Sequence, residues 1–141
     1  MIGWIAYGVL VLPIAFLAGT GRLLGTSPLS IGLQLAGFGV MVWARIAFGG
    51  RSFHAGSTPT AGGLVTSGPY RFVRHPIYLA ALLVLAGAVV AHHDVAALVA
   101  AAVAVVALAV RIISEEREVA TRYPEYVDYA RRTRRLIPWI F

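Results

Sequence analysis

Four long apolar runs, separated by short polar or glycine-rich segments, constrain this chain more than any other feature of its sequence. They cover residues 2–18, 30–48, 76–91 and 95–110. An α-helix rises about 1.5 Å per residue, and the hydrocarbon core of a bilayer is about 30 Å thick. Runs of this length therefore predict an all-α integral membrane protein with four transmembrane helices.

The composition agrees with a small membrane protein. Hydrophobic residues make up 59% of the 141 residues and charged residues only 13%, a balance too apolar for an ordinary soluble domain. The length predicts one domain, residues 1–141. The chain has no Cys, which excludes disulfides, thiolate metal sites and cysteine nucleophiles. Because no basic segment precedes Ile2, we expect the first run to be a retained span rather than a cleaved signal.

The positive charge is carried entirely by arginine and is unevenly placed. The net charge is +6, and charges beside apolar spans meet anionic lipids more often than nucleic acid. We therefore expect membrane lipids, and no nucleic acid, as partners. Arginines crowd residues 45–74 and the chain from Arg111 onward, so by the positive-inside rule both termini are expected in the cytoplasm. Arginine without lysine and abundant alanine suggest a bacterial gene, and hence the inner membrane.

The segments between and after the runs have their own signals. Residues 49–75 are rich in glycine and are expected to form a loop. Residues 111–141 are expected to continue the fourth helix, break at Tyr123-Pro124, form a short interfacial helix from Pro124 to about Arg132, and return to the interface. The alanine-rich fourth run predicts a tight antiparallel hairpin with the third. In the second run three glycines would allow close helix packing: Gly32, Gly37 and Gly39.

Polar residues gather where the third run begins and where the fourth ends. Arg74 and His75 stand immediately before Pro76, and charges at a membrane boundary are costly unless they have partners or water. They could be membrane anchors and a helix start, or part of a functional site. Arg111 and Glu115 are four residues apart and share one helix face. With four spans, the start of the third run and the end of the fourth lie on the same side of the membrane, so one site can be built from both segments. We expect no metal there or at residues 92–94, which cannot converge on one ion.

Several motifs resemble a known family, the integral membrane methyltransferases typified by isoprenylcysteine carboxyl methyltransferase, with phosphatidylethanolamine N-methyltransferases as relatives. The resemblance covers about the last 80 residues, with the motifs in the same order. The matching segments are Leu64-Val65-Thr66-Ser67-Gly68-Pro69-Tyr70, Arg74-His75-Pro76-Ile77-Tyr78, Arg111 with Glu115-Glu116, Tyr123-Pro124-Glu125-Tyr126 with Tyr129, and Ile137-Pro138.

This resemblance implies S-adenosylmethionine as the cofactor. The implied cofactor contacts are Leu64, Val65, Tyr70, His75, Pro76, Tyr78 and Glu115. Arg111 and Arg74 are implied on the substrate side as catalytic residues. A carboxylate can accept hydrogen bonds from ribose hydroxyls or an ammonium group, and tyrosines supply packing and a hydroxyl.

The expected activity is methyl transfer to a lipidic or amphiphilic acceptor that reaches the site from the bilayer. A carboxylate acceptor needs no base, and an arginine can hold it through two hydrogen bonds. One alternative is N-methylation of an amine headgroup or a small molecule, which requires removal of a proton. Another is a non-catalytic membrane subunit that retains the fold.

Overall fold

The computed structural model describes residues 2–49 and 63–137, and these ranges are helical with irregular connections. The elements are α1 (Ile2–Gly19), α2 (Pro28–Phe48), the 3-10 helix η2 (Gly68–Arg71), α3 (Pro76–His92), α4 (Val95–Arg122) and α5 (Tyr126–Arg132). In these ranges the extended pairing is limited to an isolated parallel bridge between Val73 and Arg134. The all-α prediction is confirmed.

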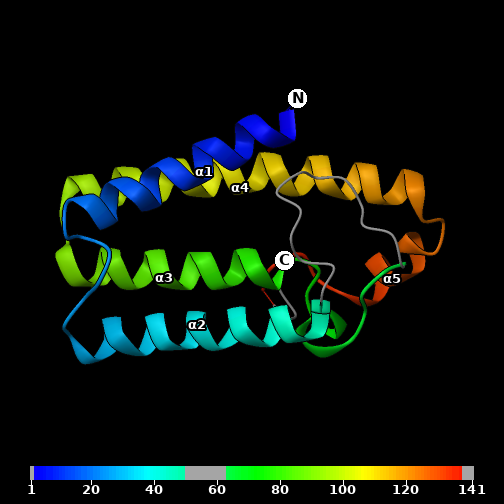
Figure 1. Cartoon of the computed structure of the whole chain (residues 1–141), viewed down its shortest axis with the longest axis horizontal. Coiled ribbons are helices and arrows are strands. Elements are labelled where there is room, and N and C mark those ends of the chain that lie inside the picture. The colour runs from blue at the N-terminus through cyan, green and yellow to red at the C-terminus, as the bar shows by residue number, and fades with distance from the viewer. Residues whose placement is uncertain (1, 50–62, 138–141) are drawn as a thin grey trace.

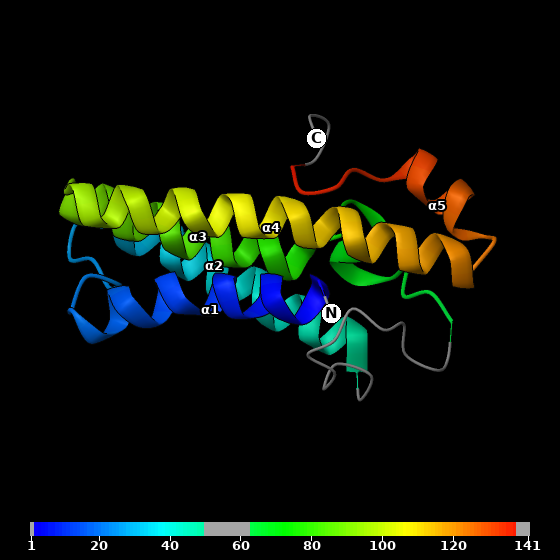
Figure 2. The same cartoon turned by 90° about the horizontal axis from the view of Figure 1, so that it is seen from above.

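The four long helices lie side by side along the long axis of the molecule, as both views show (Figures 1 and 2). The most extensive contacts join α2 to α3 and α1 to α4, and α3 packs on α4 between these pairs. Neighbouring helices alternate in direction, so α2 ends, α3 begins and α4 ends at the same end of the bundle. The helix α5 and the segment after it lie at that end as well.

Small side chains of α4 and larger side chains of its neighbours form the core. Leu17 of α1, Leu85 of α3 and Leu108 of α4 are almost fully buried. Alanines of α4 fill the space between them at helical spacing: Ala97, Ala100, Ala104 and Ala107. Side chains this small let helices approach closely, which explains why this alanine face of α4 is turned into the bundle.

Two glycines set the contact between α2 and α3. A Cβ atom on Gly37 would lie 2.8 Å from the Ala80 carbonyl oxygen, and one on Gly87 would lie 2.9 Å from the Ser30 carbonyl oxygen. By contrast, Gly32 and Gly39 face open space. The expected close packing is therefore confirmed at Gly37 and is wrong for the other two. The predicted hairpin of α3 and α4 is only part of the packing, because α3 contacts α2 more extensively.

Within residues 2–49 and 63–137, two helices are long and apolar enough to cross a membrane. They are α2, with a mean hydropathy of 1.5, and α4, with 2.6; α3 is apolar but shorter, with 17 residues. In α2 only 11% of the apolar window is buried inside the chain. The 28 residues of α4 make a helix of about 42 Å, so it extends past its apolar run, as predicted.

The boundaries follow the sequence signals closely. The helix α4 ends at the Tyr123-Pro124 step, and α5 begins two residues later than expected, at Tyr126. At the other end of the bundle, the Asp94 carboxylate accepts a hydrogen bond from the Ala97 N–H (2.7 Å) and pairs with Arg22 (2.8 Å). The glycine-rich part of the expected loop, residues 50–62, and the interfacial tail, residues 138–141, lie outside the described residues.

Candidate active site

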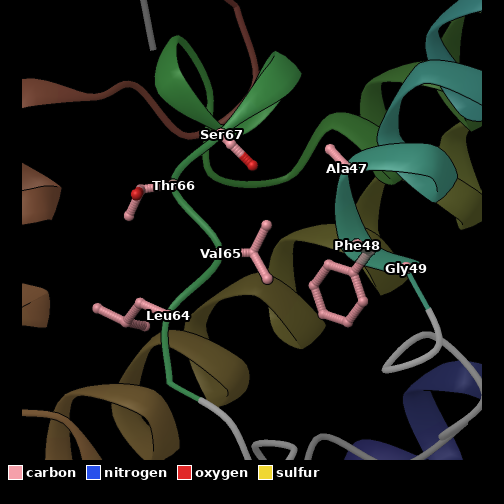
Figure 3. Close-up of a pocket in the computed structure, with 7 residues that line it drawn as sticks. All are labelled: Ala47, Phe48, Gly49, Leu64, Val65, Thr66 and Ser67. Carbon is pink, nitrogen blue, oxygen red and sulfur yellow. The ribbon is translucent and has the colours of Figure 1, made fainter.

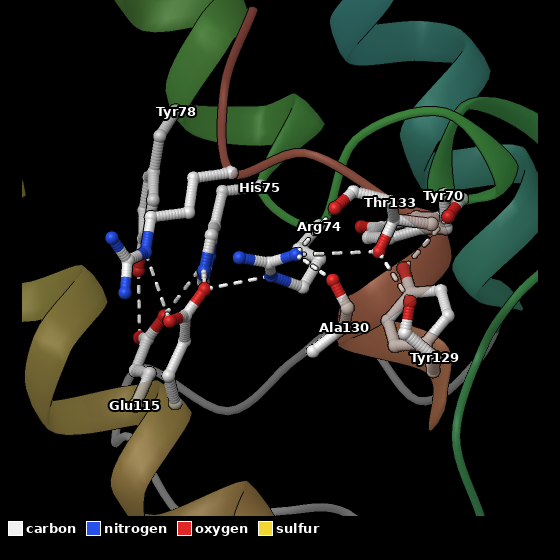
Figure 4. A network of polar contacts seen from close by, with 10 residues as sticks. Tyr70, Arg74, His75, Tyr78, Glu115, Tyr129, Ala130 and Thr133 are labelled. Atoms are coloured by element: carbon white, nitrogen blue, oxygen red, sulfur yellow. Dashed lines mark hydrogen bonds and ion pairs between the residues drawn. The ribbon is translucent and has the colours of Figure 1, made fainter. Parts of the chain in front are cut away.

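The beginning of α3 meets the C-terminal half of α4 in a compact polar cluster (Figure 4). The Tyr78 hydroxyl donates to Glu115 Oε1 (2.6 Å) and accepts a hydrogen bond from Arg111 Nε. Arg111 Nη2 lies 2.8 Å from the same Glu115 oxygen. The predicted helical spacing thus brings Arg111 and Glu115 together, and the first turn of α3 adds Tyr78. Only 4% of Arg111 is exposed.

His75 caps the start of α3 and lies between two carboxylates. Its ring stacks on that of Tyr78 at 5.4 Å, with an angle of 11° between the planes. Its Nε2 lies 3.3 Å from Glu116 Oε1, whereas its Nδ1 is 3.8 Å from Glu115 Oε2. An ionised carboxylate only accepts hydrogen bonds, so in this contact the histidine nitrogen is the donor. Pro76, the first residue of α3, is buried directly behind.

Glu116 is the centre of a second set of ion pairs. Arg74 Nε lies 2.8 Å from one carboxylate oxygen, and Arg135 Nε lies 3.0 Å from the other. Burial alone would raise the pKa of Glu116, but hydrogen bonds from His75, Arg74 and Arg135 lower it to about 2. The sequence motif contained Glu116, but the predicted site did not include it or Arg135. The position of Glu116 beside Glu115 in the sequence could have assigned it to the site. No sequence signal could have done the same for Arg135.

Arg74 ties the C-terminal segment to the start of α3. Its Nη1 donates to the carbonyl oxygens of Ala130 (2.9 Å) and Thr133 (2.6 Å). In the backbone, the N–H groups of Arg74 and His75 donate to the carbonyl oxygens of Arg134 (2.7 Å) and Arg135 (3.0 Å). The chain after α5 therefore runs beside residues 73–75. The structure places Arg74 among backbone carbonyls and beside Glu116, apart from Arg111.

Two tyrosines connect this cluster to the loop before α3. The Tyr129 hydroxyl of α5 donates to the Tyr70 carbonyl oxygen (2.7 Å), and both residues are buried. Burial raises the pKa of Tyr129 to about 12, so its hydroxyl keeps its proton as a hydrogen-bond donor. The Tyr70 ring packs on Phe48 at 5.5 Å, which joins η2 to the end of α2.

A pocket of about 450 Å³ lies where α2 ends (Figure 3). In the close-up, Val65 and Phe48 point toward each other across it. The pocket is lined by Ala47, Phe48, Gly49, Leu64, Val65, Thr66 and Ser67. The predicted cofactor residues thus fall in two places. Leu64 and Val65 line the pocket, while the later motif residues build the polar cluster, with Tyr70 between the two.

Among the described residues, the ionised side chains of the cluster do not balance in charge. Three guanidinium groups, those of Arg74, Arg111 and Arg135, surround two carboxylates, so the sum is 3 − 2 = +1 before any proton on His75 is counted. A partly buried site with excess positive charge favours an anionic group. Among residues 2–49 and 63–137, no three His, Cys, Asp or Glu side chains come together as metal ligands would.

Comparison with known proteins shows the family. The chain is 37% identical over 110 residues to the cobalt-zinc-cadmium resistance protein CzcN of Cupriavidus metallidurans, covering 77% of this chain and 46% of that protein. It is 36% identical over 110 residues to the nickel-cobalt-cadmium resistance protein NccN of Alcaligenes xylosoxydans xylosoxydans, covering 77% and 47%.

The chain therefore spans about half the length of the curated relatives it matches. No solved structure matches it. The model of the phospholipid methyltransferase family matches residues 26–126, which takes in α2, η2, α3, α4 and the polar cluster except for Arg135. The resemblance seen in the motifs is confirmed, and the chain belongs to the phospholipid methyltransferase family.

Proposed function

We propose that this chain is an S-adenosylmethionine-dependent membrane methyltransferase whose acceptor is a lipidic or amphiphilic carboxylate. The observation that carries the proposal is the meeting of His75 and Tyr78 with Arg111 and Glu115, within a family of methyltransferases. His75 and Tyr78 lie where α3 begins, and Arg111 and Glu115 lie in the C-terminal half of α4, toward the same end of the bundle. A site of this kind can hold a polar cofactor.

The residues fit the chemistry of the proposed cofactor. Its ammonium group and ribose hydroxyls need hydrogen-bond acceptors. Glu115 Oε2 can be one of them, because it lies 3.8 Å from His75 Nδ1, beyond hydrogen-bond distance. The pocket offers Phe48 and Val65 for packing and the Thr66 and Ser67 hydroxyls for polar contacts. Its volume, about 450 Å³, lies within the range of small-molecule sites.

The residues of the cluster would act mainly by positioning. When bound, S-adenosylmethionine supplies an electrophilic methyl group, and transfer is an in-line displacement whose rate depends strongly on orientation. Arg111 would hold the acceptor carboxylate through its planar guanidinium. The aromatic rings of His75 and Tyr78 would line the polar side of the site and limit access of water.

The charges favour an acid over an amine as the acceptor. Counted over the described residues, the cluster carries one excess positive charge, and a positively charged cofactor would add to it, so an anionic acceptor improves the balance. An amine acceptor would need a base to remove its proton. Glu116 is a poor base, because its three partners hold its pKa at about 2.

We further propose that α1 and α3 join α2 and α4 in crossing the membrane. With the apolar parts of the four helices in the bilayer, the polar cluster would lie at the membrane surface. Both termini would lie on the cytoplasmic side of a bacterial inner membrane. An acceptor anchored in the bilayer could then reach the pocket laterally. Residues 1–141 would then form one domain.

The test is methyl transfer by the purified protein in native lipid extract. We expect S-adenosylmethionine with an isotopically labelled methyl group to label a lipid fraction, and mild alkali to release that label as methanol, since carboxyl methyl esters are alkali-labile. Alkali-stable label would show N-methylation instead. No label above that of Glu115→Gln protein would contradict the proposal. If this chain shares the resistance role named for CzcN and NccN, we expect a methylated membrane component to account for it.

A further inference from the structure

A second surface of the molecule combines exposed aromatic rings with an exposed arginine. It lies where η2 packs on the end of α2 (Figure 1) and consists of Trp43, Phe72 and Arg71. The rings of Trp43 and Phe72 are 6.4 Å apart, and the guanidinium carbon of Arg71 lies 5.0 Å from the centre of the Phe72 ring. Trp43 is 48% exposed and Phe72 43% exposed.

The backbone holds this aromatic-arginine patch in place. Gly68 has a φ of +59°, and a Cβ on it would lie 2.7 Å from the Ala47 Cβ and 3.3 Å from the Trp43 indole nitrogen. Only glycine adopts this conformation readily at such close approach. The Phe72 carbonyl also accepts a hydrogen bond from the Arg134 N–H (3.1 Å). The patch is thus fixed to α2 on one side and to the C-terminal segment on the other.

Arg71 differs from the arginines of the polar cluster. Within the described ranges no carboxylate pairs with it, and its contact there is with the Phe72 ring. An exposed arginine over an aromatic ring keeps its outer N–H groups for a ligand. Guanidinium groups match phosphate oxygens through two parallel hydrogen bonds. The charge of the patch therefore calls for an anionic ligand, and its aromatic rings suit a membrane interface.

The surface next to the patch is apolar along α2. Four side chains at helical spacing are 40–74% exposed: Leu35, Phe38, Val42 and Ile46. The helix itself is long and apolar enough to cross a membrane. This stripe leads to Trp43, so a molecule with a phosphate head at Arg71 and long apolar chains along the stripe would fit both surfaces.

We infer that the aromatic-arginine patch binds the headgroup of an anionic phospholipid, whose acyl chains lie along the exposed stripe of α2. This site is separate from the polar cluster and does not depend on the proposed methyl transfer. Binding of the lipid would anchor η2, and with it the pocket residue Ala47, at a fixed depth in the membrane.

Quenching of tryptophan fluorescence tests the site. The chain has three tryptophans, so Trp4→Phe and Trp139→Phe would leave Trp43 as the reporter. We expect brominated phosphatidylglycerol to quench Trp43 more than brominated phosphatidylcholine at the same mole fraction. Removing one arginine near the membrane surface should lower the preference for phosphatidylglycerol about fivefold, so Arg71→Gln should nearly abolish that preference. Added salt should weaken the preference in the parent protein.

The matched control is Arg122→Gln, an exposed arginine at the end of α4. It removes the same charge and should keep the preference. Equal quenching by both lipids, an unchanged preference in Arg71→Gln, or an equal loss in Arg122→Gln would each overturn the inference. Native mass spectrometry of retained phosphatidylglycerol gives the same comparison in protein with all three tryptophans, should the double Trp variant fold poorly.

Discussion

At the scale of single residues, Glu116 shows how the site is held. Its carboxylate contacts His75 at the start of α3 and Arg135 in the C-terminal segment, so one side chain joins three parts of the chain. Breaking a buried ion pair by removing one partner leaves the other charges uncompensated. Glu116 is therefore expected to matter for stability and for the position of His75, whatever the acceptor.

The pH dependence of stability should reveal this carboxylate. Its pKa is lowered from 4.5 to about 2, so its stabilising effect is complete above about pH 4.5 and is lost as the pH falls toward 2. We expect Glu116→Gln to destabilise the protein by about 2 kcal/mol at neutral pH and to flatten the acid decline. Thermal unfolding in detergent between pH 2 and 7 measures both, with the exposed Glu118→Gln as control. Parallel curves for Glu116→Gln and the parent would contradict this role.

Arg111 offers a test of roles within the cluster. In Arg111→Lys the charge near Glu115 remains, and Tyr78 still donates to the carboxylate, but the planar pair of donors is lost. We expect cofactor affinity to change by less than about threefold, while kcat/KM for the acceptor falls by about tenfold or more, the value of one charge-assisted hydrogen bond. Calorimetry and steady-state methyl transfer measure the two quantities. A larger loss of cofactor affinity than of turnover would assign Arg111 to the cofactor.

At the scale of elements, Gly37 controls the packing of α2 on α3. Gly37→Ala would place a Cβ 2.8 Å from the Ala80 carbonyl oxygen, and overpacking of this kind costs about 1–3 kcal/mol. Gly39→Ala is the matched control, since it lies on the same helix and faces open space. Gly39→Ala should be neutral or slightly stabilising, because alanine favours helices. Equal midpoints of unfolding for both variants would refute the close contact.

The C-terminal segment gives a second test at this scale. Arg74→Ala removes the donors to the Ala130 and Thr133 carbonyls, so we expect the pairing beside residues 73–75 to open more often. Hydrogen exchange at the Arg74 and His75 amides should speed up by about tenfold, the value of one to two lost hydrogen bonds. Arg132→Ala, on an exposed side chain, should leave these amides protected. Unchanged exchange in Arg74→Ala would show that the segment is held by other contacts.

The sequence predicted the helices better than their contacts. Apolar runs and the Tyr123-Pro124 step located the four long helices and the end of α4 to within a few residues, because hydropathy and proline act locally. The pairing of residues 73–75 with 134–135 spans about 60 residues of chain, and no local pattern encodes it. For the same reason Arg135 was missed. The sequence also could not show that Gly37 contacts α3 while Gly32 and Gly39 face open space.

At the scale of the whole molecule, the account rests on the meeting of two distant segments at one end of the bundle. The alternating helices bring the start of α3 beside the C-terminal half of α4 (Figure 1), and the segment after α5 pairs with residues 73–75. The apolar helices can then sit in the membrane while the polar groups gather at its surface. The polar cluster around Glu115 and the pocket at the end of α2 are thus two separate places, which Tyr70 connects.

The most direct test is calorimetric titration of S-adenosylmethionine into the purified protein, its Glu115→Gln variant and the control Glu118→Gln. A charge-assisted hydrogen bond contributes about 1.5–3 kcal/mol, so we expect Glu115→Gln to weaken binding about tenfold to hundredfold while the control binds like the parent. No heat of binding to the parent, or equal affinity in Glu115→Gln, would contradict a cofactor site at the junction of α3 and α4.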